Sequence, residues 1–85
     1  MSEPEPPIMT PTRPGLYRHY KGNLYQVVGM VRHSETLEAM TLYRALYGEH
    51  GLWVRPAAMF AQEIVFEGML QPRFAWVAEQ TDPLL

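Results

Sequence analysis

Short apolar and aromatic runs separated by glycine-containing turns fill the middle of the chain, and this spacing is what most constrains the fold. Residues 16–20 alternate apolar or aromatic side chains with polar ones, as a half-buried strand does. The triplet Lys21-Gly22-Asn23 predicts a compact turn into a second strand over residues 24–31. Gly29 inside that run indicates a bulge or strong bend. Strands this short, joined this tightly, predict an antiparallel hairpin in a curled sheet.

Residues 40–47 have a composition compatible with a helix, but their side-chain pattern favours a strand. Tyr43, Ala45 and Tyr47 fall on one face of a strand with a two-residue period, and Gly48 ends it. We therefore predict a third strand here.

The last third of the chain continues the alternation of short elements. Residues 51–54 predict a short strand, and residues 56–60 suit one 3₁₀ or α turn because proline stands at its start. Residues 62–67 and 73–77 predict a last pair of strands joined through Gly68. The polar connection over residues 34–38 has the composition for a short helical turn.

These predictions define an all-β fold, a small curled antiparallel sheet closest to an SH3-like barrel with one short 3₁₀/α turn. A single domain is expected over residues 13–79, since 85 residues are too few to divide one core into two. Residues 1–12 are rich in Pro and Glu, and with residues 80–85 they are predicted to be flexible tails.

Composition excludes several classes of protein. The absence of cysteine removes disulfides, thiolate metal sites and a cysteine nucleophile. No apolar run approaches the roughly 20 residues that span a bilayer, and no secretory signal is present, so a cytoplasmic protein without membrane contact is expected. The net charge is −2, yet no acid occurs between Glu5 and Glu35, where four basic residues lie. The first half of the domain is therefore locally basic.

Several strings of consecutive residues resemble the small bacterial family known as domain of unknown function family 1653. The resemblance covers residues 14–76, and the strings that carry it are Tyr17-Arg-His-Tyr-Lys-Gly22, Arg32-His-Ser-Glu-Thr36, Leu46-Tyr-Gly48, Leu52-Trp-Val-Arg-Pro56, Met59-Phe60 and Pro72-Arg-Phe74. It implies an SH3-type barrel, in agreement with the strand pattern above. No activity, cofactor or catalytic residue comes with the resemblance.

Basic and aromatic residues near strand ends predict a binding surface. Arginine forks recognise carboxylate and phosphate, and aromatic faces stack on proline rings, bases or guanidinium planes. The hairpin is expected to bring Arg18 close to His33. The predicted ligand is a peptide or protein segment, with nucleic acid or a small anion as the alternative. The predicted ligand-binding residues are Arg18, His19, Lys21, Arg32, His33, Glu35, Trp53 and Arg55.

Two catalytic alternatives use the same region. His33, Ser34, Glu35 and His19 contain the residue types of a small Ser/His hydrolase, but adjacent strand residues point to opposite faces. A metal site from the three histidines, including His50, with Glu35 would suit zinc. Because the histidines are scattered, we predict no catalytic residue, no metal and no cofactor.

Five apolar residues at the end of the predicted helical turn and beyond it are expected to form core or part of a dimer face, namely Met59, Phe60, Ile64, Val65 and Phe66. The predicted oligomeric state is a monomer or weak homodimer.

Overall fold

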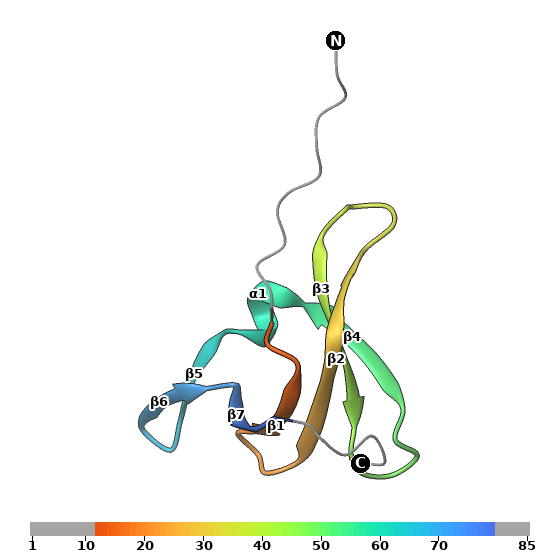
Figure 1. Ribbon diagram of the computed structural model, residues 1–85. Helices are drawn as coiled ribbons and strands as arrows, with labels where there is room; N and C mark the ends of the chain where they lie inside the picture. The colour runs from red at the N-terminus through yellow and green to blue at the C-terminus, as the bar shows by residue number, and fades with distance from the viewer. Residues whose placement is uncertain (1–11, 80–85) are drawn as a thin grey trace.

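The fold is a curled antiparallel sheet with a separate two-stranded hairpin beside it (Figure 1). The computed structural model describes residues 12–79, so the predicted tails lie almost wholly outside the described residues. The elements are β1 (Gly15–His19), β2 (Leu24–Arg32), β3 (Ala39–Ala45), β4 (Leu52–Pro56), α1 (Ala57–Phe60), β5 (Glu63–Phe66), β6 (Met69–Pro72) and β7 (Phe74–Ala78).

The larger sheet has five strands in the order β4-β3-β2-β1-β7, and each neighbouring pair is antiparallel. The all-β curled sheet predicted from the sequence is therefore confirmed. Closure into a barrel is not part of this arrangement, because within residues 12–79 the outer strands β4 and β7 do not pair with each other. Among the described residues, both strands keep one edge whose backbone groups have no strand partner.

The last pair of strands was wrongly predicted. The strand expected over residues 73–77 exists as β7, but it pairs with β1 instead of β5. The partner of β5 is β6, a strand that the sequence analysis did not predict. A two-residue turn containing Gly68, whose φ is +77°, joins β5 to β6. The physical reason is that a two-residue turn suits a tight hairpin. β5 therefore pairs with the residues that directly follow the turn.

The middle strands follow the predicted pattern. The β2–β3 register shifts between Val27 and Gly29, which is the bulge expected at Gly29. β3 buries Tyr43 and Ala45 on one face, as the two-residue period predicted. The strand ends at Ala45, so Tyr47 lies in the following turn.

Aromatic rings dominate the core. Tyr17, Val27, Tyr43, Phe60 and Phe74 are buried together and come from four strands and α1. The rings of Phe60 and Phe74 stack with centroids 4.1 Å apart and planes 4° from parallel. α1 thus places one side chain, Phe60, inside the curl of the sheet.

Most of the apolar residues after α1 are exposed. Only Phe60 of the five residues predicted as core is buried, and Val65 on β5 keeps 71% of its surface in solvent. The physical reason is that the β5–β6 hairpin stands outside the larger sheet and has no sheet packed on it. Among residues 12–79, no helix is long and apolar enough to cross a membrane.

Candidate functional site

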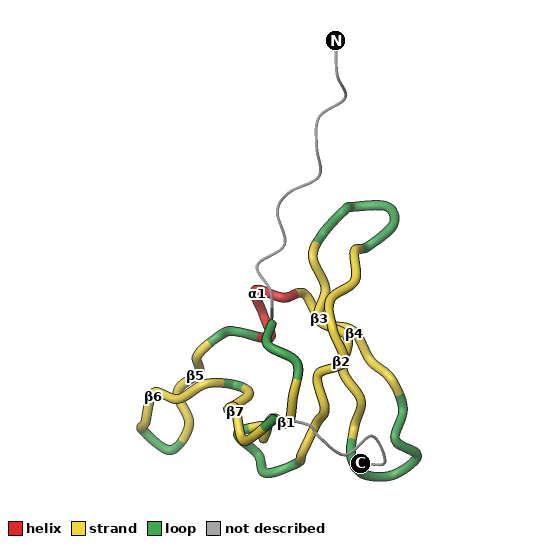
Figure 2. The backbone as a smooth tube through the Cα atoms, in the orientation of Figure 1, coloured by secondary structure: helices red, strands yellow, loops and turns green. Residues whose placement is uncertain are grey.

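The predicted binding residues lie at opposite ends of the β1–β2 hairpin. Arg18 pairs across the sheet with Leu24, at the start of β2, whereas Arg32 and His33 lie at its far end. β2 has nine residues, so its ends are roughly 25 Å apart at about 3.3 Å per residue. The β2–β3 hairpin carries the second group away from the rest of the sheet (Figure 2). The expectation that Arg18 and His33 are neighbours is therefore wrong.

Arg32 and His33 belong to a loop at the far end of β2, and hydrogen bonds within this loop hold it in place. Nδ1 of His33 accepts the backbone N–H groups of Glu35 and Thr36 at 3.1 and 3.2 Å. The guanidinium of Arg32 donates to the carbonyl of Leu37 at 2.9 Å. These side chains close a turn. One helical turn is present at the predicted place, since the N–H of Leu37 donates to the carbonyl of His33 at 2.8 Å, and it does not continue into a helix.

This loop does not assemble a hydrolase or a metal site. Nδ1 of His33 is engaged by backbone donors, and His19 lies at the other end of β2, far from Ser34. No group of three or more His, Cys, Asp or Glu side chains within residues 12–79 is placed to hold a metal ion. Both catalytic alternatives therefore lack the convergence that they require.

We expect His33→Ala to destabilise the domain by about 1 kcal/mol, because two backbone donors lose their acceptor. Urea unfolding followed by circular dichroism measures the change. Ser34→Ala is the matched control, since this exposed side chain makes no hydrogen bond within the described residues, and it should stay within about 0.5 kcal/mol of wild type. Equal losses in the two variants would contradict the role given to His33.

The structure assembles a different set of basic and aromatic side chains at the turn end of the β1–β2 hairpin. We call it the aromatic–basic surface, and it consists of His19, Tyr20, Lys21, Tyr25, Tyr47, Arg55, Phe66 and Arg73. Three predicted residues belong to it, namely His19, Lys21 and Arg55. Arg18 follows the other face of β1 and is exposed there.

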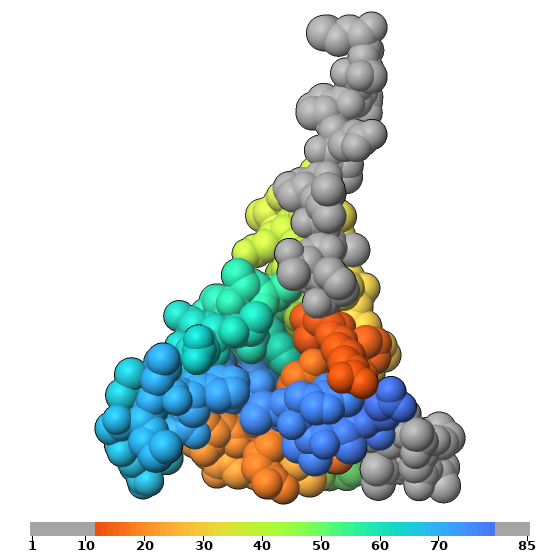
Figure 3. Space-filling model, turned by 60° about the vertical axis from the view of Figure 1, so that its left-hand side comes forward, coloured from red at the N-terminus to blue at the C-terminus, as the bar shows by residue number. Residues whose placement is uncertain are grey.

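Five rings of this surface form a continuous row. Centroid distances between successive rings are 5.6 Å from Tyr47 to Tyr25, 6.2 Å from Tyr25 to His19, and 4.4 Å from His19 to Tyr20. The row ends on the β5–β6 hairpin, where Phe66 lies 5.1 Å from Tyr20. Figure 3 shows this hairpin beside the β1–β2 turn at the base of the molecule. All five rings are partly or largely exposed, so part of each ring can contact a ligand.

The cations around His19 lack acidic partners within residues 12–79, where the single ion pair is Arg13–Glu79. The pKa of His19 is lowered first by burial and then by the positive charges of Arg55, Arg73 and Lys21. Every charged group that shifts this pKa is a cation. The surroundings of His19 are therefore locally positive.

Tyr25 is tied to the row by a hydrogen bond to the hydroxyl of Tyr47 at 2.8 Å. Burial, helped by this bond, raises the pKa of Tyr25 from 10.0 to about 12. The folded state therefore keeps a proton that the unfolded chain releases near pH 10.

We expect this difference to make stability depend on pH in alkaline solution. The contribution of Tyr25 to the free energy of unfolding is fully present below pH 10 and is lost as the pH rises toward about 12. Tyr25→Phe should therefore give a shallower fall of the urea midpoint over this window. A residual fall is expected from Tyr17, whose pKa is also raised by burial. Identical slopes for wild type and variant would contradict this assignment.

Trp53 extends the surface beyond Tyr47. Its position on β4 is in register with Tyr43, and 60% of its surface is exposed. Trp53 and Tyr47 line one recess of about 220 Å³ at the β3–β4 turn. An exposed tryptophan beside a hollow is typical of a ligand contact.

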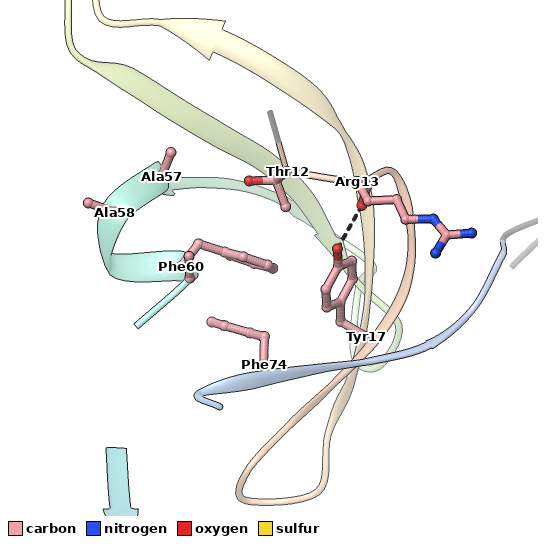
Figure 4. A pocket seen from close by; sticks show the side chains of 8 residues that line it. Thr12, Arg13, Tyr17, Ala57, Ala58, Phe60 and Phe74 are labelled. Carbon is pink, nitrogen blue, oxygen red and sulfur yellow. Dashed lines mark hydrogen bonds between the residues drawn. The ribbon is translucent and has the colours of Figure 1, made fainter. Parts of the chain in front are cut away.

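A second recess lies beside α1 and has mainly apolar walls (Figure 4). Its volume is about 340 Å³, and Phe60, Phe74 and Tyr17 face it. The Tyr17 hydroxyl donates to the carbonyl of Arg13 at 2.8 Å, and the hydroxyl of Thr12 bonds that of Thr41 at 2.8 Å. Because these polar groups are already paired, the recess offers mostly apolar contact.

The predicted ligand-binding residues did not include five members of this surface, namely Tyr20, Tyr25, Tyr47, Phe66 and Arg73. Arg73 precedes β7, and its carbonyl accepts the N–H of Tyr20 at 2.9 Å, which places the two side by side. The string Pro72-Arg-Phe74 was a signal in the sequence, but the predicted strand pairing put it next to β5. The β1–β7 pairing explains why Arg73 lies near His19.

The comparisons with known proteins identify the family. The family described as protein of unknown function DUF1653 matches residues 15–76. A crystal structure of a DUF1653 protein from Bordetella bronchiseptica is similar, with 37% identity and a TM-score of 0.75. The alignment covers 84% of this chain and 94% of the other. No curated protein matches. With both sequence and fold shared over most of its length, the chain belongs to the DUF1653 family.

Proposed function

We propose that this domain is a binding module that holds an extended peptide segment of a partner protein on its aromatic–basic surface. The observation that carries the proposal is the continuous row of five partly exposed rings bordered by cations. Ring faces stack on proline rings, aromatic side chains and arginine planes, which extended peptides present in succession.

Two further features favour a peptide over a nucleic acid. The unpaired edges of β4 and β7 offer backbone hydrogen bonds to an added strand, a common mode of peptide recognition. The chain has a net charge of −2 and a pI near 5.8, whereas nucleic-acid binders usually carry a strongly basic face.

A phage library of random 12-residue peptides, selected on the immobilised full-length chain, tests the proposal. Selected peptides should bind wild type and lose at least about tenfold in affinity to Trp53→Ala, because exposed tryptophans at interfaces are frequent hot spots. Isothermal titration calorimetry measures the change.

Leu52→Ala is the matched control, since Leu52 is a similarly exposed neighbour whose side chain alternates to the other face of β4. It should bind the selected peptides like wild type. Failure to select any peptide, or equal losses in the two variants, would overturn the proposal. Tight, steeply salt-dependent binding of single-stranded oligothymidylate in place of peptides would assign the surface to nucleic acid.

A further inference from the structure

Two arginines at the aromatic–basic surface carry buried N–H groups that have no partner. The Nε atoms of Arg55 and Arg73 are both inaccessible to solvent and make no hydrogen bond within the described residues. A buried donor left without an acceptor destabilises the folded state. Neither Nε–H group finds an acceptor in the described part of the chain, so the two guanidinium groups are not satisfied by the fold itself.

The two arginines come from separate elements, and both lie near enough to His19 for their charges to lower the pKa of its ring. Arg55 lies on β4 in register with Thr41, and its Cζ is 5.7 Å from the centre of the Phe74 ring. Arg73 is adjacent to Phe74 in sequence, and its guanidinium donates one bond to Gln62 at 3.2 Å. Apart from that bond, the terminal N–H groups of both guanidinium groups make no hydrogen bond within residues 12–79, so they can donate to a ligand.

His19 supplies a third donor. Its ring lies 4.9 Å from the ring of Phe74, and its Nδ1 accepts the backbone N–H of Lys21 at 3.2 Å. Because Nδ1 is the acceptor, the neutral ring carries its hydrogen on Nε2 and can donate it to a ligand. The groups around this ring are Arg55 from β4, Arg73 before β7, Lys21 in the β1–β2 turn and the neutral tyrosines of the row.

From this geometry we infer that Arg55, Arg73 and His19 form a carboxylate-binding site. The inference rests on the proposed function, because the carboxylate would belong to the bound peptide. A carboxylate has two oxygens with about four lone-pair positions, so it can accept bonds from both guanidinium groups and from the ring. The aromatic row then contacts the residues that flank the acidic one.

The test uses small compounds that separate the possible sources of the carboxylate. N-acetyl-glutamate α-amide presents a side-chain carboxylate, N-acetyl-glycine presents a terminal one, and N-acetyl-glutamine α-amide is the neutral control. The readout is the ring pKa of His19, followed by NMR in the full-length chain. Either carboxylate should raise that pKa, because a bound anion stabilises the imidazolium, and the neutral amide should leave it unchanged.

Arg55→Gln and Arg73→Gln should each weaken the response to carboxylate about tenfold, since each removes a charged donor. If one of these variants does not fold, the other still tests the inference. Arg18→Gln is the matched control, because it removes the same charge from the other face of β1. The resonances of His33 and His50 should not respond to the compounds.

Absence of a His19 response in wild type, or an equal loss in Arg18→Gln, would overturn the inference. So would a response to inorganic phosphate without one to either carboxylate. The selected peptides could lack Asp, Glu and a free terminus and leave the ring pKa of His19 unchanged. That result would refute the carboxylate site while the peptide-binding function stands. A His19 response without any selected peptide would instead refute the peptide-binding function.

Discussion

Phe74→Ala should destabilise the domain by about 3–5 kcal/mol, enough to leave a domain of this size largely unfolded. Phe74 is 6% exposed, and its ring stacks on Phe60 at 4.1 Å. It also contacts Tyr25 and Tyr43 at 5.5 and 5.8 Å. Removal of the ring therefore leaves a cavity among side chains from β2, β3 and α1. Urea unfolding followed by circular dichroism and tryptophan fluorescence measures the loss.

Phe66→Ala is the matched control, because it deletes the same group from the exposed β5–β6 hairpin. Phe66 is 36% exposed, and the one aromatic ring it contacts within the described residues is Tyr20. We expect less than half the loss seen for Phe74→Ala. A loss as large in Phe66→Ala would mean that the hairpin belongs to the cooperative core, contrary to its place outside the larger sheet.

Gly15→Ala should cost about 2–4 kcal/mol, the second largest effect that we expect. A Cβ at this position would lie 2.4 Å from Cζ3 of Trp76 and 2.9 Å from the carbonyl oxygen of Ala78. The φ of Gly15 is +148°, a conformation that residues with a side chain rarely adopt. A shift of Trp76 would disturb its contacts with the guanidinium of Arg13, 3.8 Å from the ring centre, and with the ring of Tyr17. Steric overlap and backbone strain therefore add together.

Gly29→Ala provides the comparison for Gly15→Ala in the same urea experiment. A Cβ at Gly29 would meet no atom within 4 Å, so the change should stay within about 0.5 kcal/mol of wild type. The double variant Gly15→Ala, Trp76→Leu should recover part of the loss, because the indole is the nearest obstacle. If the double variant recovers no stability, the whole loss in Gly15→Ala comes from backbone strain and not from overlap with the indole.

The strands β1 to β3 could be predicted because their signals are local. Alternation of apolar and polar side chains, the turn at Gly22 and the bulge at Gly29 all act between residues that are close in sequence. The partner of β7 could not be predicted in this way. Its pairing with β1 joins residues about 60 positions apart, and no short pattern distinguishes it from pairing with β5.

The same limit explains the candidate site. His19, Lys21 and Arg55 were recognised as residue types suited to a ligand, but Arg32 and His33 have the same chemistry and serve a loop instead. Arg73 and Tyr47 entered the site only through contacts with Tyr20 and Tyr25. Residue type indicates what a side chain can bind, whereas its neighbours decide whether it is free to do so.

The sequence by itself determined the all-β class and most strand positions, since the two-residue period and turn chemistry are set by neighbouring residues. Tertiary structure alone decided that Arg55 and Arg73 meet near His19. That meeting depends on β7 pairing with β1 and on the curl of the sheet that brings β4 toward it. Long-range pairing and burial govern such a convergence, because its contacts form only when the whole chain has packed.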